Sequence, residues 1–96
     1  MKRTEILSIL NQHRNELQEF GVKSLALFGS AAREEAREDS DVDILVEFSR
    51  SVGLFEFVRL ERFLEGLLGR PVDLATPDAL RPEMREQVLK EAVYAT

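Results

Sequence analysis

The chain has no cysteine and no tryptophan, a single histidine, and only three prolines among its 96 residues. Without cysteine, neither a disulfide nor a thiolate metal site can form. No apolar run approaches the roughly 20 residues that a membrane-spanning helix requires, and the first apolar run is too short for a signal peptide. We therefore expect a cytoplasmic protein with no membrane partner, organised as one domain over residues 1–96.

Positive charge is also scarce. Lys and Arg together number 13 against 18 Asp and Glu, which gives a net charge of −5. The basic residues are interspersed with glutamates, whereas proteins that grip a nucleic-acid backbone present a basic face. This balance argues against extended nucleic-acid binding. A single nucleotide presented with Mg²⁺ remains compatible, because the metal supplies positive charge.

Apolar residues recur at helical and strand spacing in alternating segments. We expect helices over residues 4–20, 30–38, 54–68 and 82–93, and strands over 22–28, 41–48 and 71–75. The order helix–strand–helix–strand–helix–strand–helix predicts a small α/β (α+β) domain, in which helices flank a three-stranded sheet.

Two aspartates open the second expected strand, in the run Asp41-Val42-Asp43. Because side chains alternate along a strand, both carboxylates lie on one face, about 6.6–7 Å apart. A hard divalent cation would relieve their repulsion, and Mg²⁺ is the usual choice where phosphates are present. Asp41 could instead be a solvated residue at a strand start, but Asp43 within an apolar strand is costly unless paired or metal-bound.

The first expected strand ends in Gly29-Ser30, a turn that opens a helix. Glycine permits a tight turn close to a phosphate, and the free N–H groups of a helix start bind phosphate. Ser30 could donate to the β- or γ-phosphate, and it would equally serve as a helix N-cap. Arg33, one turn later, could reach a phosphate, orient an aspartate, or be solvated. Metal and phosphate elements together indicate nucleotide chemistry.

These residues resemble a known signature. Gly29-Ser30, Arg33 and Asp41-x-Asp43 are similar to the G-S-x-A-R … S-D-x-D pattern of the minimal nucleotidyltransferases, members of the DNA polymerase β-like superfamily. The resemblance covers nearly the whole chain. It implies the polymerase β-like nucleotidyltransferase fold, with a mixed sheet in strand order 1-2-3.

The resemblance also implies a third acidic residue on the third strand, which Asp73 matches. Its alternative is an ion pair with Arg70 or another nearby cation. By this resemblance the catalytic and metal-binding residues, holding two Mg²⁺ ions, are Asp41, Asp43 and Asp73. The residues that bind the nucleotide phosphates are then Gly29, Ser30 and Arg33.

The activity that the resemblance implies is transfer of NMP to an acceptor hydroxyl, and we expect AMP from ATP. Minimal members are often encoded beside a small helical HEPN-domain protein, as toxin–antitoxin pairs in which the nucleotidyltransferase adenylylates a tyrosine of its partner. One alternative is an antitoxin that acts by binding alone, for which exposed Val93 and Tyr94 would be evidence. Another is transfer to a small molecule such as an aminoglycoside, in a pocket built by homodimerisation. Contacts in loop 49–53 would set the nucleotide preference, but the sequence of this loop does not indicate which base is preferred.

Three further positions bear on the hypothesis. Glu34, followed by Glu35, stands where the family usually has glycine after the motif arginine, which places negative charge near the expected triphosphate entrance. His13 is interpreted as a core-edge histidine with a hydrogen-bond partner, since no second ligand lies at helical spacing. Glu47 shares the strand parity of Asp43 but lies about 13 Å further on, too far to share its ions.

Overall fold

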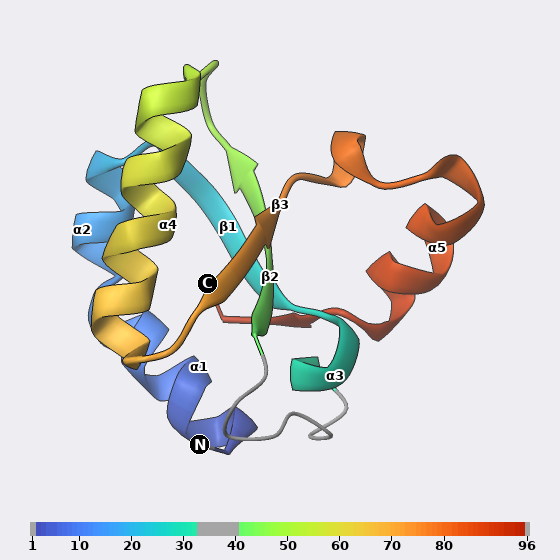
Figure 1. Cartoon of the computed structure of the whole chain (residues 1–96), viewed down its shortest axis with the longest axis horizontal. Coiled ribbons are helices and arrows are strands. Elements are labelled where there is room, and N and C mark those ends of the chain that lie inside the picture. Colours follow the sequence, from blue (N-terminus) through green and yellow to red (C-terminus); the bar gives the residue numbers. More distant parts are fainter. Residues whose placement is uncertain (1, 33–40, 96) are drawn as a thin grey trace.

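Residues 2–32 and 41–95 are described by the structure, a computed structural model (Figure 1). The elements run in the order α1 (Arg3–Gln12), α2 (Arg14–Glu19), β1 (Val22–Leu27), α3 (Gly29–Ala32), β2 (Val42–Phe48), α4 (Leu54–Leu68), β3 (Val72–Ala75), the 3₁₀ helix η1 (Pro77–Ala79), α5 (Pro82–Glu91) and β4 (Val93–Tyr94).

The strands form one mixed sheet in the order β3-β2-β1-β4. β2 runs antiparallel to β1 and parallel to β3, and β4 adds an antiparallel edge beside β1. The expected class and the neighbouring strands 1-2-3 are confirmed. The expected count of three strands was wrong by one: the last helix ends at Glu91 instead of residue 93, and Val93–Tyr94 pairs with β1.

The hydrophobic core lies between one face of the sheet and helices α1, α2 and α4, which Figure 1 shows together on one side. Alternate residues of β1 and β2 point into it and meet the apolar stripes of these helices, as the strand and helix periods require. The side chains that are at most 1% exposed include Ile6, Leu10, Leu17, Leu25, Leu27, Val42, Ile44, Val46, Leu60 and Leu64. α5 lies on the opposite side of the sheet from α4 (Figure 1), whereas α3 contributes the buried residues Ala31 and Ala32 to the core.

The first helical segment is broken at His13, where one helix was expected over residues 4–20. The backbone there leaves the helical region (φ −106°, ψ 19°), so α1 ends and α2 begins. The Nδ1 atom of His13 makes a 2.9 Å hydrogen bond with the carbonyl oxygen of Ile9, and its ring meets Phe63 edge-on at 6.5 Å. The interpretation of His13 as a hydrogen-bonded core-edge residue is confirmed.

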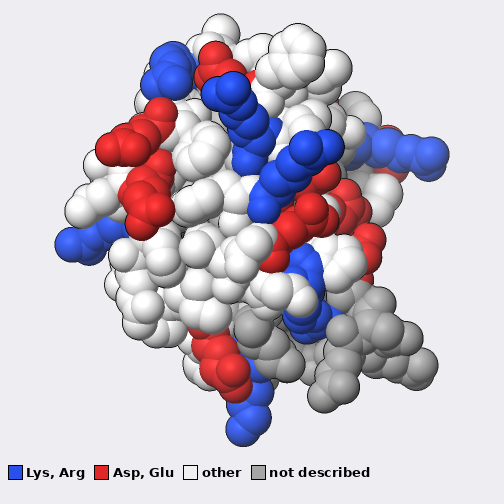
Figure 2. Space-filling view, turned by 60° about the vertical axis from the view of Figure 1, so that its left-hand side comes forward, with Lys and Arg blue, Asp and Glu red and all other residues white. Residues whose placement is uncertain are grey.

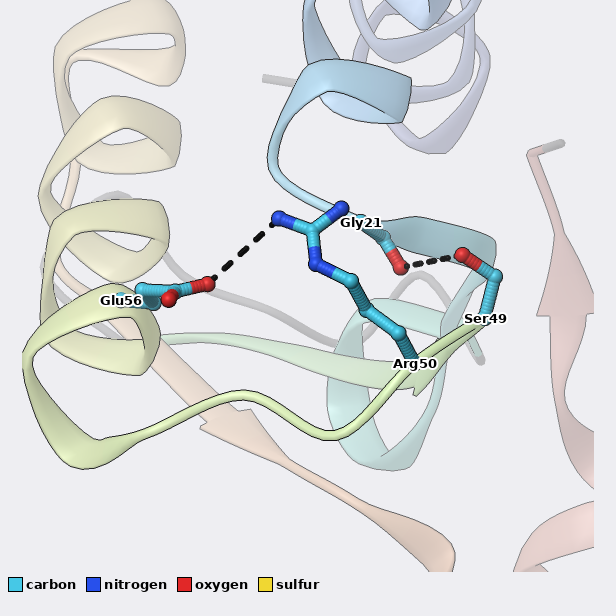
Figure 3. A network of polar contacts seen from close by, with 4 residues as sticks. All are labelled: Gly21, Ser49, Arg50 and Glu56. Carbon is cyan, nitrogen blue, oxygen red and sulfur yellow. Dashed lines mark hydrogen bonds and ion pairs between the residues drawn. The ribbon is translucent and has the colours of Figure 1, made fainter.

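A network of polar contacts ties the start of β1 to the segment after β2 (Figure 3). The Ser49 N–H and hydroxyl both donate to the Gly21 carbonyl, at 2.8 and 3.2 Å. Arg50 lies against Gly21 and forms an ion pair with Glu56 of α4 at 3.6 Å. Gly21 has a φ of +86°, a conformation that suits glycine. These contacts hold loop 49–53 between the sheet and α4.

Different contacts fix the two ends of α4, and the ion pair of Arg50 with Glu56 lies in its first turn. At its far end, Glu65 accepts a 3.1 Å hydrogen bond from the backbone N–H of Val72, which sets the start of β3.

None of the helices in the described ranges is long and apolar enough to cross a membrane.

Candidate functional site

Two of the predicted site residues lie directly opposite each other on neighbouring strands. Asp43 of β2 and Asp73 of β3 are register partners in the parallel pair. Adjacent strands lie about 4.8 Å apart and register partners project to the same face. Because Val42, Ile44 and Leu74 point into the core, the two aspartates point to the opposite face. Asp43 is half-buried and Asp73 is exposed.

Asp41 lies at the edge of this arrangement. It is exposed and immediately precedes β2, whose first N–H, that of Val42, donates to the Pro71 carbonyl at 2.9 Å. The entries to β2 and β3 are thereby joined. Among residues 2–32 and 41–95, no three His, Cys, Asp or Glu side chains gather closely enough to hold a metal ion. The structure therefore brings together two carboxylates, those of Asp43 and Asp73, and Asp41 lies two residues before Asp43.

The Gly29 turn packs against the Asp43 carboxylate. Gly29 has a φ of +59°, and a Cβ built there would stand 2.5 Å from Oδ2 of Asp43 and 3.3 Å from its Cγ. The N–H of Phe28 also donates to the Asp43 carbonyl at 3.1 Å. Glycine is needed here because a side chain would collide with Asp43 and because the backbone is left-handed. Sequence reasoning assigned Gly29 to phosphate approach and missed this contact, since only the fold brings positions 29 and 43 together.

The remaining predicted phosphate ligands are only partly visible. Ser30 is the second residue of α3, and its side chain is outside what the structure describes. Arg33 also lies outside the described residues, as do Glu34, Glu35 and the rest of the helix expected over 30–38 beyond residue 32. The described turn of α3 is anchored by Ala31 and Ala32, which are 2% and 5% exposed and belong to the core.

The donor set suits a hard divalent cation. Mg²⁺ is usually bound through one or two protein carboxylates together with substrate phosphates, without a complete protein cage. Asp43 and Asp73 supply carboxylate oxygens on one face, next to the turn that opens α3. Such a pair fits Mg²⁺ brought in with a nucleotide, and a third protein ligand in the same cluster is not required.

A groove of about 800 Å³ lies beyond the carboxylates, at the far ends of β2 and β3. It is lined by residues 46–48, 50–54, 57 and 76–78. Glu47 lines this groove and lies four residues further along β2 than Asp43. It is therefore separated from the carboxylate pair, as expected. The volume falls within the range of small-molecule sites.

The surface charge is mixed. On the face shown in Figure 2, which brings the side of α1, α2 and α4 forward, Lys and Arg alternate with Asp and Glu and form no continuous basic patch. This face offers nothing for an extended phosphate backbone to follow.

Comparisons with known proteins bear on the fold and the family of this chain. The family described as nucleotidyltransferase domain matches residues 10–95. The chain is 50% identical over 91 residues to the protein adenylyltransferase MntA of Thermococcus cleftensis, covering 94% of this chain and 92% of that protein.

Solved structures give the same fold. A structure assigned to the minimal nucleotidyltransferases superposes with a TM-score of 0.84 at 41% identity, over 97% of this chain and 95% of that one. One chain of a structure of a tri-AMPylated HEPN toxin of Shewanella oneidensis in complex with an MNT antitoxin matches with a TM-score of 0.59 at 20% identity, over 91% of this chain and 70% of that chain. The second likeness shows the fold alone.

Proposed function

This chain belongs to the nucleotidyltransferase domain family, and we propose that it transfers AMP from ATP to a hydroxyl group of a partner protein. The observation that carries the proposal is the carboxylate pair of Asp43 and Asp73, held in register beside the glycine turn that opens α3. The relationship to a protein adenylyltransferase over nearly the whole chain supports AMP as the transferred group.

In this proposal the chain's own residues position the reactants. Asp43 and Asp73, with Asp41 beside them, would hold Mg²⁺, which supplies the positive charge that offsets the triphosphate and the leaving pyrophosphate. The backbone N–H groups of Gly29 and Ser30 would hold phosphate oxygens, and Arg33 would add a cation. The close contact between Gly29 and Asp43 would keep the phosphate-binding turn at a fixed distance from the carboxylates.

The transfer itself requires little covalent work from the protein. The acceptor oxygen would form a bond with the α-phosphorus of ATP, the bond from that phosphorus to the bridging oxygen would break, and pyrophosphate would leave. Asp73, the more exposed of the register partners, would accept the proton of the acceptor hydroxyl. Both aspartates stand on a hydrogen-bonded sheet whose other face is buried, and such rigidity favours a reaction that depends on positioning.

We propose that the acceptor arrives on another molecule, a helical HEPN-domain protein, with this chain as its antitoxin. The described helices all pack around one sheet, and the carboxylate face carries no further domain among these residues. A structure of the same fold is bound to a HEPN toxin that carries AMP groups.

An antitoxin that acts by binding alone is the second candidate, and exposed apolar side chains favour it. Leu54 and Phe55 at the start of α4 are 76% and 87% exposed, and Tyr94 is 52% exposed. Val93, by contrast, packs partly against the core. If Asp43→Asn neutralised the partner in cells as completely as the unchanged chain does, binding would account for neutralisation and catalysis would not.

The proposed function is tested with α-labelled ATP and Mg²⁺ in lysate from the native host. The unchanged protein should label a protein acceptor, and Asp43→Asn should not. Glu86→Gln is the matched control, because it removes one negative charge from an exposed site on α5. Equal labelling by Asp43→Asn and the unchanged protein would overturn the proposal.

A further inference from the structure

The chain contains one tyrosine, and it lies on the same face of the sheet as the carboxylate pair. In the register of the sheet, Tyr94 of β4 pairs with Ala26 of β1, which pairs with Leu45 of β2. Register partners share a face, and Leu45 is two residues from Asp43, so Tyr94 shares the face of Asp43. The neighbours of Tyr94, Val93 and Ala95, pack against the core on the other side, as alternation requires.

The sheet also sets how far Tyr94 lies from the site. Two strand spacings across the sheet and one two-residue step along it place the Cα atoms of Tyr94 and Asp43 roughly 12 Å apart. Side chains stand roughly perpendicular to a sheet, so Tyr94 and a nucleotide bound over the carboxylates would project from the same face and approach each other above it. Tyr94 is 52% exposed and lies on the edge strand of the sheet.

We propose that Tyr94 is a self-modification site: the enzyme transfers AMP from ATP to the hydroxyl of its own Tyr94, within one molecule. The inference rests on the proposed function, since it uses the same transfer. The phenolic oxygen forms a bond with the α-phosphorus, the bond to the bridging oxygen breaks and pyrophosphate leaves. The phenolic proton passes to water, because Asp73 lies one strand further from Tyr94 than Asp43 does. The product is a tyrosine–AMP phosphodiester at the edge of the sheet.

The test uses the purified protein alone, with α-labelled ATP and Mg²⁺, followed by digestion and mass spectrometry. The unchanged protein should acquire one AMP, on Tyr94, at a first-order rate that does not change with protein concentration. Tyr94→Phe, which keeps the ring and removes the hydroxyl, should remain unlabelled and yet still label the acceptor in lysate. Circular dichroism and the Tm of Tyr94→Phe control for folding.

A mixture of two variants tests whether the reaction stays within one molecule. Asp43→Asn retains Tyr94 but lacks the proposed catalytic carboxylate, and Tyr94→Phe retains the carboxylate but lacks the acceptor. The inference predicts no label in the mixture; label on Asp43→Asn would show transfer between molecules and overturn it. Label at another residue, or none on a protein that does label the lysate acceptor, would also overturn it. Absence of label both on the purified protein and on any acceptor in the lysate would overturn the proposed function itself.

Discussion

Gly29 and Asp43 are in such close contact that any side chain at position 29 would overlap the carboxylate: an added Cβ would stand 2.5 Å from Oδ2. The turn that opens α3 and the carboxylate of β2 therefore fix each other's position. Since Asp43 is also the register partner of Asp73, one glycine links the proposed phosphate-binding turn to both acidic strands.

Gly29→Ala should consequently reduce both stability and transfer. A left-handed residue other than glycine costs about 1–2 kcal/mol, and the collision with Asp43 adds to this cost and displaces the carboxylate. Chemical denaturation measures the first effect and AMP transfer per folded molecule measures the second. Gly66→Ala is the control, because its added Cβ meets nothing within 4 Å in the last turn of α4, and it should stabilise by at most about 0.5–1 kcal/mol. Equal effects from the two substitutions would contradict the account.

Removing either carboxylate charge should stop transfer while the fold is retained. Asp43→Asn and Asp73→Asn each keep the side-chain shape, and we expect transfer to fall by about 10²-fold or more, the scale on which single electrostatic groups contribute to catalysis. The readout is the initial rate of labelling, with the Tm as a check on folding. A rate within twofold of the unchanged protein for Asp43→Asn would remove that residue from the proposed mechanism.

Mg²⁺ with ATP should stabilise the protein through the same carboxylates. A ligand that binds only the folded state, at 100 times its Kd, adds about 2.7 kcal/mol to the free energy of unfolding. The Tm of the unchanged protein should rise with Mg²⁺ and a non-hydrolysable ATP analogue together, and that of Asp43→Asn should rise much less. An equal rise in both proteins would place nucleotide and metal binding elsewhere.

The Gly21 network should affect stability without affecting the chemistry. Gly21→Ala forces alanine into a φ of +86° and brings its Cβ to 3.1 Å from the Arg50 guanidinium, which should cost about 1–2 kcal/mol. The ion pair of Arg50 with Glu56 is half-exposed, so Arg50→Ala should cost under about 1 kcal/mol. Denaturation curves compare the two, and transfer per folded molecule should stay unchanged. A larger cost for Arg50→Ala would show that the side-chain contacts matter more than the glycine conformation.

Much of the fold could be predicted from local pattern. Helical spacing predicted α4 over residues 54–68 as observed, and the apolar runs located β1, β2 and β3. β4 could not be predicted, because two residues carry no period and their strand state depends on pairing with β1. The break at His13 was also missed, since the apolar spacing on either side of it continues.

The candidate site could be predicted only where it depends on a local sequence pattern. Alternation along a strand is local, so it placed Asp41 and Asp43 on one face. The apposition of Asp73 with Asp43 depends on the register of two strands thirty residues apart in sequence, and only the resemblance suggested it. The contact of Gly29 with Asp43 depends on how β1 leads into α3, which no pattern of residue types specifies.

The central claim, that the face carrying Asp43 and Asp73 transfers a nucleotidyl group, is tested most directly by comparing two labels. Parallel reactions with Mg²⁺ and host lysate would contain ATP labelled either at the α- or at the γ-phosphate. The account predicts protein labelling from the α-labelled nucleotide only, with loss of that label in Asp43→Asn. Label from the γ-phosphate, or α-label that persists in Asp43→Asn, would contradict it.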